Sequence, residues 1–127
     1  MMQKVKFLGL LTVALLPLQS YGAASVESFD LRSARDLVDL CAVAADDPMA
    51  EAAHGFCYGF LSGAGDYHRA INAGENPRPL FCLPAKRPSR VETANSYVAW
   101  SRAHPQHLDE APVDNLIRFA VATWPCQ

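Results

Sequence analysis

The amino-acid sequence predicts an all-α fold, a small bundle of about four to five helices crosslinked by two disulfides. Two observations carry this prediction. Apolar residues recur at three- and four-residue spacings between good capping residues, and no segment shows the two-residue alternation of a half-buried strand. In addition, the 127-residue chain holds four cysteines, an even number, downstream of an apolar leader. Cysteines of exported proteins tend to pair.

The leader has the layout of a cleaved secretory signal. Lys4 and Lys6 precede an apolar run of 12 residues, 7–18, and small residues follow at Gly22, Ala23 and Ala24. A membrane-spanning helix needs about 20 apolar residues, so the run predicts a signal rather than an anchor. We therefore expect a cleaved signal peptide over 1–24 and a single domain over 25–127, in the periplasm and without membrane association after cleavage.

The first helices are predicted from their caps. Ser25–Leu31 is expected to be short and extended, and Ser33 to cap a helix over 34–44. Asp47-Pro48 is a typical helix opening, and it begins the longest predicted helix, over 48–72. Gly74 is expected to close that helix in the left-handed conformation.

Three glycines, Gly55, Gly59 and Gly63, lie four residues apart on one face of the long predicted helix. Each costs roughly 0.5–1 kcal/mol relative to alanine in a helix interior. We interpret them as a helix-packing stripe, where another helix backbone approaches closely. A stripe that admits a ligand is the alternative.

Two further helices are predicted, over 90–103 and 112–123. Ser89 and Glu92 form a capping-box pattern at the start of the first, and His104-Pro105 ends it. Spacing in the last helix predicts an apolar core face made of Val113, Leu116, Ile117, Ala120 and Val121. In the helix before it, Val91, Ala94, Val98 and Tyr97 are expected to point inward.

The four cysteines, Cys41, Cys57, Cys82 and Cys126, allow three pairings. Antiparallel helix pairs favour Cys41–Cys57 and Cys82–Cys126 over the others. A zinc site would need closely spaced cysteine pairs, and the sequence has no Cys-x-x-Cys. Structural disulfides are therefore the preferred interpretation, with no metal and no cofactor.

No catalytic set emerges from the remaining residues. His104 and His107 are separated by a proline, which predicts a solvated corner rather than a metal site. Ser62 lies in the middle of a predicted helix, unlike a nucleophile elbow. The part after residue 24 has 9 basic and 13 acidic residues, a balance that does not suggest nucleic-acid binding. We expect a protein that is not an enzyme.

Motifs along most of the chain resemble the Rap/Tai family of type VI secretion immunity proteins. They are the runs 36–41 and 57–66, Phe81-Cys82-Leu83-Pro84, His104-Pro105 and Trp124-Pro125-Cys126. The resemblance covers about 33–126 and includes all four cysteines. It implies a periplasmic immunity protein that binds and neutralises a secreted effector, a cell-wall hydrolase, with a peptidoglycan amidase as the favoured candidate. Some members form homodimers, so a homodimer is a further expectation.

The resemblance transfers no effector-contacting residues. For the contact surface we select the polar loop that contains Gly74, Glu75, Asn76 and Arg78, with a plain connecting loop as the alternative. An acidic chain would steer toward a basic toxin. The rival function is a small exported structural or adaptor protein of the cell envelope with no toxin partner.

Overall fold

The computed structural model describes residues 23–127, so the predicted signal peptide lies almost wholly outside the described residues. A short 3₁₀ helix, η1 (Val26–Asp30), leads into α1 (Ala34–Cys41) and the long α2 (Ala50–Ile71). A loop then connects to α3 (Arg90–Ala103), which is followed by η2 (Pro105–His107) and α4 (Pro112–Thr123). The described part of the chain contains no strand, which confirms the all-α prediction.

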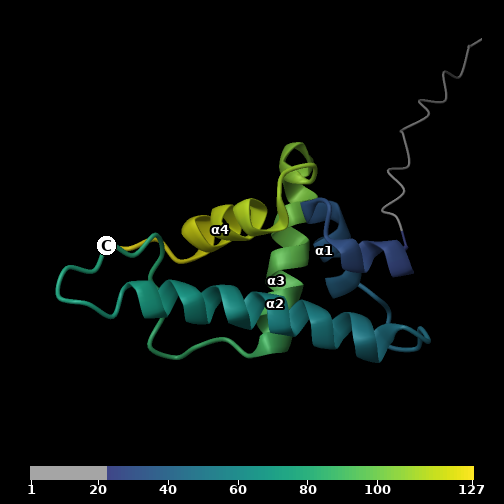
Figure 1. Ribbon diagram of the computed structural model, residues 1–127, viewed down its shortest axis with the longest axis horizontal. Helices are drawn as coiled ribbons and strands as arrows, with labels where there is room; N and C mark the ends of the chain where they lie inside the picture. Colours follow the sequence, from purple (N-terminus) through teal and green to yellow (C-terminus); the bar gives the residue numbers. More distant parts are fainter. Residues whose placement is uncertain (1–22) are drawn as a thin grey trace, which may run out of the picture.

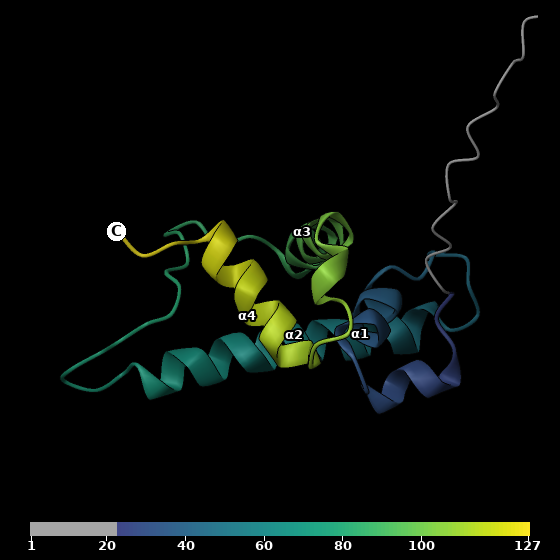
Figure 2. The same cartoon turned by 90° about the horizontal axis from the view of Figure 1, so that it is seen from above.

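The helices form an open arrangement rather than parallel layers. Figure 1 shows α2 along the length of the molecule with α3 crossing it. The short α1 packs against α2, α3 and α4. In both views the C-terminal half of α2 and the whole of α4 extend to the same side of α3 (Figures 1 and 2). α2 and α4 both contribute residues to a cavity that is described below.

The helix ends follow the predicted capping chemistry closely. α3 has the predicted bounds, and the Ser89 hydroxyl accepts a hydrogen bond from the Glu92 amide at 3.2 Å while the Glu92 carboxylate accepts one from the Ser89 amide at 2.7 Å. At α1, the Ser33 amide donates to Asp36 at 3.0 Å. The α1 helix is three residues shorter than predicted at its C-terminal end, and α2 is two residues shorter at its start and one at its end, which is close to the usual uncertainty at helix termini.

The N-terminal segment is not extended, contrary to the prediction. It forms η1, in which the Ser25 amide donates to the Ser28 hydroxyl at 3.1 Å. The ring of Phe29 packs edge-on against Phe56 of α2, with 5.4 Å between centroids. Local serine capping and one aromatic contact therefore hold this segment against α2.

A single hydrophobic core lies where the four helices meet. Its buried members come from every helix and from the turn before α4: Leu37, Val38, Cys41, Cys57, Leu61, Ala94, Tyr97, Val98, Leu108, Leu116 and Phe119. The Cys41–Cys57 disulfide lies within this core and joins α1 to α2. The Cys82–Cys126 disulfide is at the surface and joins the loop after α2 to the C-terminus. The structure thus has the pairing that the sequence favoured.

The glycine stripe is not a packing surface within this chain, which corrects the prediction. A Cβ built at Gly55, Gly59 or Gly63 would meet nothing within 4 Å among the described residues. The buried positions of α2 include Ala53, Cys57 and Leu61. Because each helical residue turns by about 100°, a glycine two positions away lies on the opposite, outward face.

The buried face of α4 also differs from the predicted one. Leu116 and Ala120 are buried as expected, but Val113 and Val121 are 47% and 42% exposed. Phe119 and Asn115, which the apolar pattern did not select, are buried instead. The helix is turned toward Asn115 because that amide finds buried partners on neighbouring segments. In α3, Val91 is likewise exposed, whereas Ala94, Tyr97 and Val98 are buried.

Candidate functional site

The loop between α2 and α3 begins with an anchored turn. The Asn72 side chain accepts a hydrogen bond from the Arg78 amide at 2.8 Å and donates one to the His68 carbonyl at 2.8 Å. It therefore satisfies a carbonyl in the last turn of α2. Gly74 does not take the predicted left-handed conformation, since no described glycine has a positive φ. The Asn72 amide, rather than Gly74, caps the helix.

Two further contacts hold the end of this loop. The Leu80 amide donates to Nε2 of His68 at 3.0 Å, and the His68 ring stacks on Phe81 with 3.9 Å between centroids. Beyond Phe81, the Cys82 amide donates to the Trp124 carbonyl at 2.8 Å, next to the Cys82–Cys126 disulfide. The exposed residues Gly74, Glu75, Asn76 and Arg78 thus belong to a loop that is tied at both ends.

The position of the loop suits a contact surface. Figure 1 shows that it projects beyond the C-terminal end of α2, at the end of the molecule away from α1. Figure 2 shows the same projection from above. A polar loop that protrudes and is tied at both ends loses less conformational entropy on binding than a free one.

A cavity of about 580 Å³ lies next to this loop. We call it the α2–α4 groove. Its lining comes from α2 from Tyr58 onward and the two residues that follow the helix, from the loop between Phe81 and Pro88, from the start of α3, and from α4 with Trp124. Most of the lining is apolar, including Leu61, Phe81, Leu116, Phe119, Ala120 and Trp124. Its volume is in the range of cavities that bind ligands or side chains.

The charged residues that line the groove are mostly cationic. Arg69, Arg87 and Arg90 contribute to it, and Asp66 is the single acidic residue among its lining residues. Arg69 is paired with Asp66 at 3.0 Å. Among the described residues, no ion pair involves Arg87 or Arg90, and both are exposed. Two arginines without an ion pair among the described residues therefore line the groove beside its apolar residues.

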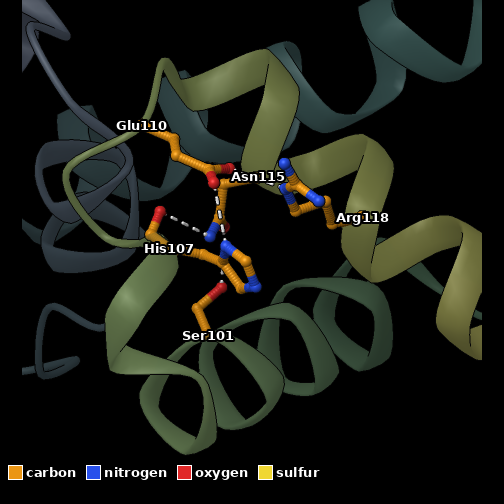
Figure 3. A network of polar contacts seen from close by, with 5 residues as sticks. All are labelled: Ser101, His107, Glu110, Asn115 and Arg118. Carbon is orange, nitrogen blue, oxygen red and sulfur yellow. Dashed lines mark hydrogen bonds and ion pairs between the residues drawn. The ribbon is translucent and has the colours of Figure 1, made fainter.

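The histidine corner after α3 is a structural network rather than a site for chemistry. Figure 3 shows the contacts: the Ser101 hydroxyl donates to Oδ1 of Asn115 at 2.9 Å, and the Asn115 amide donates to the His107 carbonyl at 3.1 Å. Glu110 lies 2.8 Å from Nδ1 of His107 and 2.7 Å from Nε of Arg118. The network joins α3, η2 and α4.

The charges of this corner support the same interpretation. The hydrogen bond from Arg118, and then that from His107, lowers the pKa of Glu110 below its ordinary value. His104 makes none of the contacts that join Glu110 to His107 and Arg118. Its Nδ1 is 2.7 Å from the Trp100 carbonyl, and its ring stacks on Trp100. Within residues 23–127, no three histidine, cysteine or acidic side chains are grouped so as to hold a metal ion.

The buried amide of Asn115 gives a first prediction. Replacing it by alanine removes two hydrogen bonds and leaves the Ser101 hydroxyl and the His107 carbonyl without this partner. Unsatisfied buried groups of this kind cost about 1–3 kcal/mol, so we expect a loss of that size in the free energy of unfolding, measured by urea denaturation. Asn95→Ala, at an exposed position of α3, is the control and should change it by about 0.5 kcal/mol or less. An Asn115→Ala protein as stable as the control would contradict the role of the network.

The remaining candidates for chemistry are occupied or isolated. All four cysteines are in disulfides, so none is free as a thiol. Ser62 lies within α2, where it contributes to the groove wall. Among residues 23–127, no helix is both long and apolar enough to cross a membrane.

Comparison with protein families agrees with this geometry. The family model of the Rap1a immunity proteins matches residues 33–126, which is most of the chain. The chain belongs to the Rap1a immunity protein family. The matched range begins at the cap of α1 and ends at the last cysteine, so the family domain contains the four helices and both disulfides. No curated protein and no solved structure gives a significant match.

Membership of the Rap1a immunity proteins confirms the resemblance noted in the sequence. It supports an immunity protein of type VI secretion, a family whose members are generally non-enzymatic. The sequence also placed the loop after α2 correctly between two helices. It did not reveal the groove, because the lining residues come from four separate segments. The one available signal was the group of cationic residues at Arg69, Arg78, Lys86, Arg87 and Arg90.

Proposed function

We propose that this chain is a periplasmic immunity protein that neutralises a type VI secretion effector by stoichiometric binding, and that the effector is a peptidoglycan amidase. The observation that carries the proposal is the family match over residues 33–126. Two disulfides support an oxidising compartment such as the periplasm. The amidase follows from the better-known toxins of the family that the sequence resembles.

Inhibition by binding is supported by the two disulfides, because they crosslink the helical core and the candidate contact loop. One disulfide fixes α1 on α2 within the core, and the other fixes the loop after α2 to the C-terminus. Rigid binding surfaces lose less entropy on association. The open glycine face of α2 is also available to a second chain, and a homodimer remains part of the proposal.

The function is tested by affinity capture from cells in which type VI secretion is active. The tagged protein should retain one cell-wall hydrolase at near-equal stoichiometry, and the purified pair should show inhibition of sacculus hydrolysis. Recovery of no hydrolase from cells shown to deliver effectors would contradict the proposal and favour the rival, an exported structural or adaptor protein.

The loop carries a second prediction. Glu75→Ala/Arg78→Ala removes two exposed side chains while keeping the Arg78 amide that bonds to Asn72. If the loop contacts the effector, we expect affinity to fall about tenfold or more, since interface residues of importance cost above about 1 kcal/mol each. Isothermal titration calorimetry with the captured hydrolase measures the change.

The matched control is Asp30→Ala/Arg32→Ala, an exposed ion pair beside η1. It also removes one acidic and one basic side chain, at a site distant in the sequence from the loop. The control should bind within about twofold of the unmodified protein, because exposed ion pairs contribute little to stability. Equal affinity of both variants would reject the loop as a contact surface.

A further inference from the structure

We propose that the α2–α4 groove is the surface that receives the effector, and that its occupant is an extended acidic segment of that protein carrying apolar side chains. The inference rests on the proposed function, since it takes the partner to be the effector. It differs from the loop hypothesis in naming a concave surface and the chemistry of what fills it.

The shape of the groove favours an extended segment. Its wall on α2 runs from Tyr58 to Arg69, which at 1.5 Å per residue is about 17 Å. A peptide in the extended conformation rises about 3.3 Å per residue, so five or six residues match that length. A compact head group would occupy only part of it.

The floor of the groove favours apolar side chains in the occupant. Leu61, Phe81 and Phe119 are buried residues whose surfaces contribute to the lining, and Trp124 is half-buried beside them. The rings of Phe119 and Trp124 lie 5.3 Å apart in an edge-to-face arrangement. Buried aromatic pockets of this kind accept the anchoring side chains that dominate interface energies.

The charge of the groove favours carboxylates in the occupant. Arg87 and Arg90 are exposed and have no ion pair among the described residues, as shown above. The described part of the chain is acidic overall. Seven of its acidic residues, however, lie between positions 27 and 51, which is far in the sequence from Arg87 and Arg90. Arginine binds carboxylates through two parallel hydrogen bonds, so unneutralised arginines beside an apolar floor suit an acidic, apolar peptide.

The groove is also continuous with the proposed contact loop. Asn72 and Ala73 line the groove, and Asn72 is the residue that anchors the loop through the Arg78 amide. One partner segment can therefore lie along the groove while the loop contacts the same protein. An acidic segment would complement this cationic end, although the whole chain is acidic.

The test uses peptides of defined sequence, so it does not depend on an identified effector. The ¹⁵N-labelled protein, expressed from its first methionine into an oxidising periplasm, is titrated with capped DEFLDE, KKFLKK and DESGDE. We expect saturable amide shifts for DEFLDE at α2 residues after Tyr58, at Phe81 and at α4. KKFLKK and DESGDE should give at least tenfold weaker binding. Binding of DEFLDE should weaken as salt rises from about 20 to 500 mM, through screening.

Two variants separate the groove from general charge effects. Arg87→Ala/Arg90→Ala should weaken DEFLDE at least tenfold, whereas Arg32→Ala/Arg35→Ala, with the same change in net charge, should stay within about twofold. The amide spectra of both variants report whether each is folded. Shifts outside the groove, equal binding of the acidic and basic peptides, or binding of decanoate in place of DEFLDE would overturn the proposal.

The outcome is distinguishable from failure of the proposed function. If the protein captures its hydrolase but Arg87→Ala/Arg90→Ala binds that hydrolase with unchanged affinity, the groove assignment is overturned and the immunity function stands. If DEFLDE occupies the groove but no hydrolase is captured, the proposal that the groove receives the effector is overturned. Loss of hydrolase binding in the Arg87→Ala/Arg90→Ala protein, together with DEFLDE shifts in the groove, supports both.

Discussion

Phe119→Ala is expected to lower the free energy of unfolding by about 3–5 kcal/mol, the usual cost of removing a large aromatic side chain from a core. Phe119 is 1% exposed and its ring meets three aromatic rings, those of Tyr97, Trp100 and Trp124, at centroid distances of 5.6, 6.2 and 5.3 Å. Urea denaturation followed by circular dichroism measures the change.

Val121→Ala on the same helix is the matched control. Val121 is 42% exposed, so its truncation should cost about 0.5 kcal/mol or less. The pair discriminates the buried face in the structure from the one predicted by apolar spacing, which included Val121 and omitted Phe119. A larger loss for Val121→Ala than for Phe119→Ala would show that α4 buries the other face.

Removing the internal disulfide is expected to have an effect of similar size. The Cys41→Ala/Cys57→Ala protein loses a crosslink over 16 residues, which constrains the unfolded chain by about 3 kcal/mol. It also loses two buried sulfur atoms, since Cys41 and Cys57 are 6% and 0% exposed. We therefore expect a total loss of about 3–5 kcal/mol, measured by urea denaturation under non-reducing conditions.

The surface disulfide provides the comparison. Cys82→Ser/Cys126→Ser opens a crosslink over 44 residues without removing buried core atoms, so its effect comes from chain entropy alone and is about 4 kcal/mol for this longer loop. It should additionally loosen the loop between Asn72 and Cys82, seen as faster amide exchange there. If the Cys41→Ala/Cys57→Ala protein were as stable as the unmodified one, the internal disulfide would have no role in stability.

Much of the fold was predictable because the helix ends depend on interactions between residues that are close in the sequence. The Ser89–Glu92 capping box and the break at His104-Pro105 act through hydrogen bonds and steric limits within a few residues, and the structure places α3 between them as predicted. The helical periodicity also excluded strands. The disulfide pairing followed once the helices were taken as antiparallel neighbours.

The face that each helix buries was not predictable in the same way. A three- and four-residue spacing is compatible with neighbouring faces of α4, and the structure distinguishes them by the buried partners of Asn115 and the burial of Phe119. The same holds for the glycines of α2, whose spacing resembles a packing stripe although Gly59 lies opposite the core. Apolar periodicity cannot identify a buried polar residue such as Asn115, because its hydrogen-bond partners are distant in the sequence.

The sequence by itself determined the helical class, the helix boundaries within a few residues and the family, and it favoured the cysteine pairing that the structure has. Only the tertiary structure decided the candidate site. Phe81, Arg87 and Trp124 come from different segments and line one groove because α2 and α4 diverge from α3 on the same side. Local hydrogen bonds and caps act within a few residues, whereas a concave surface depends on the relative placement of whole helices.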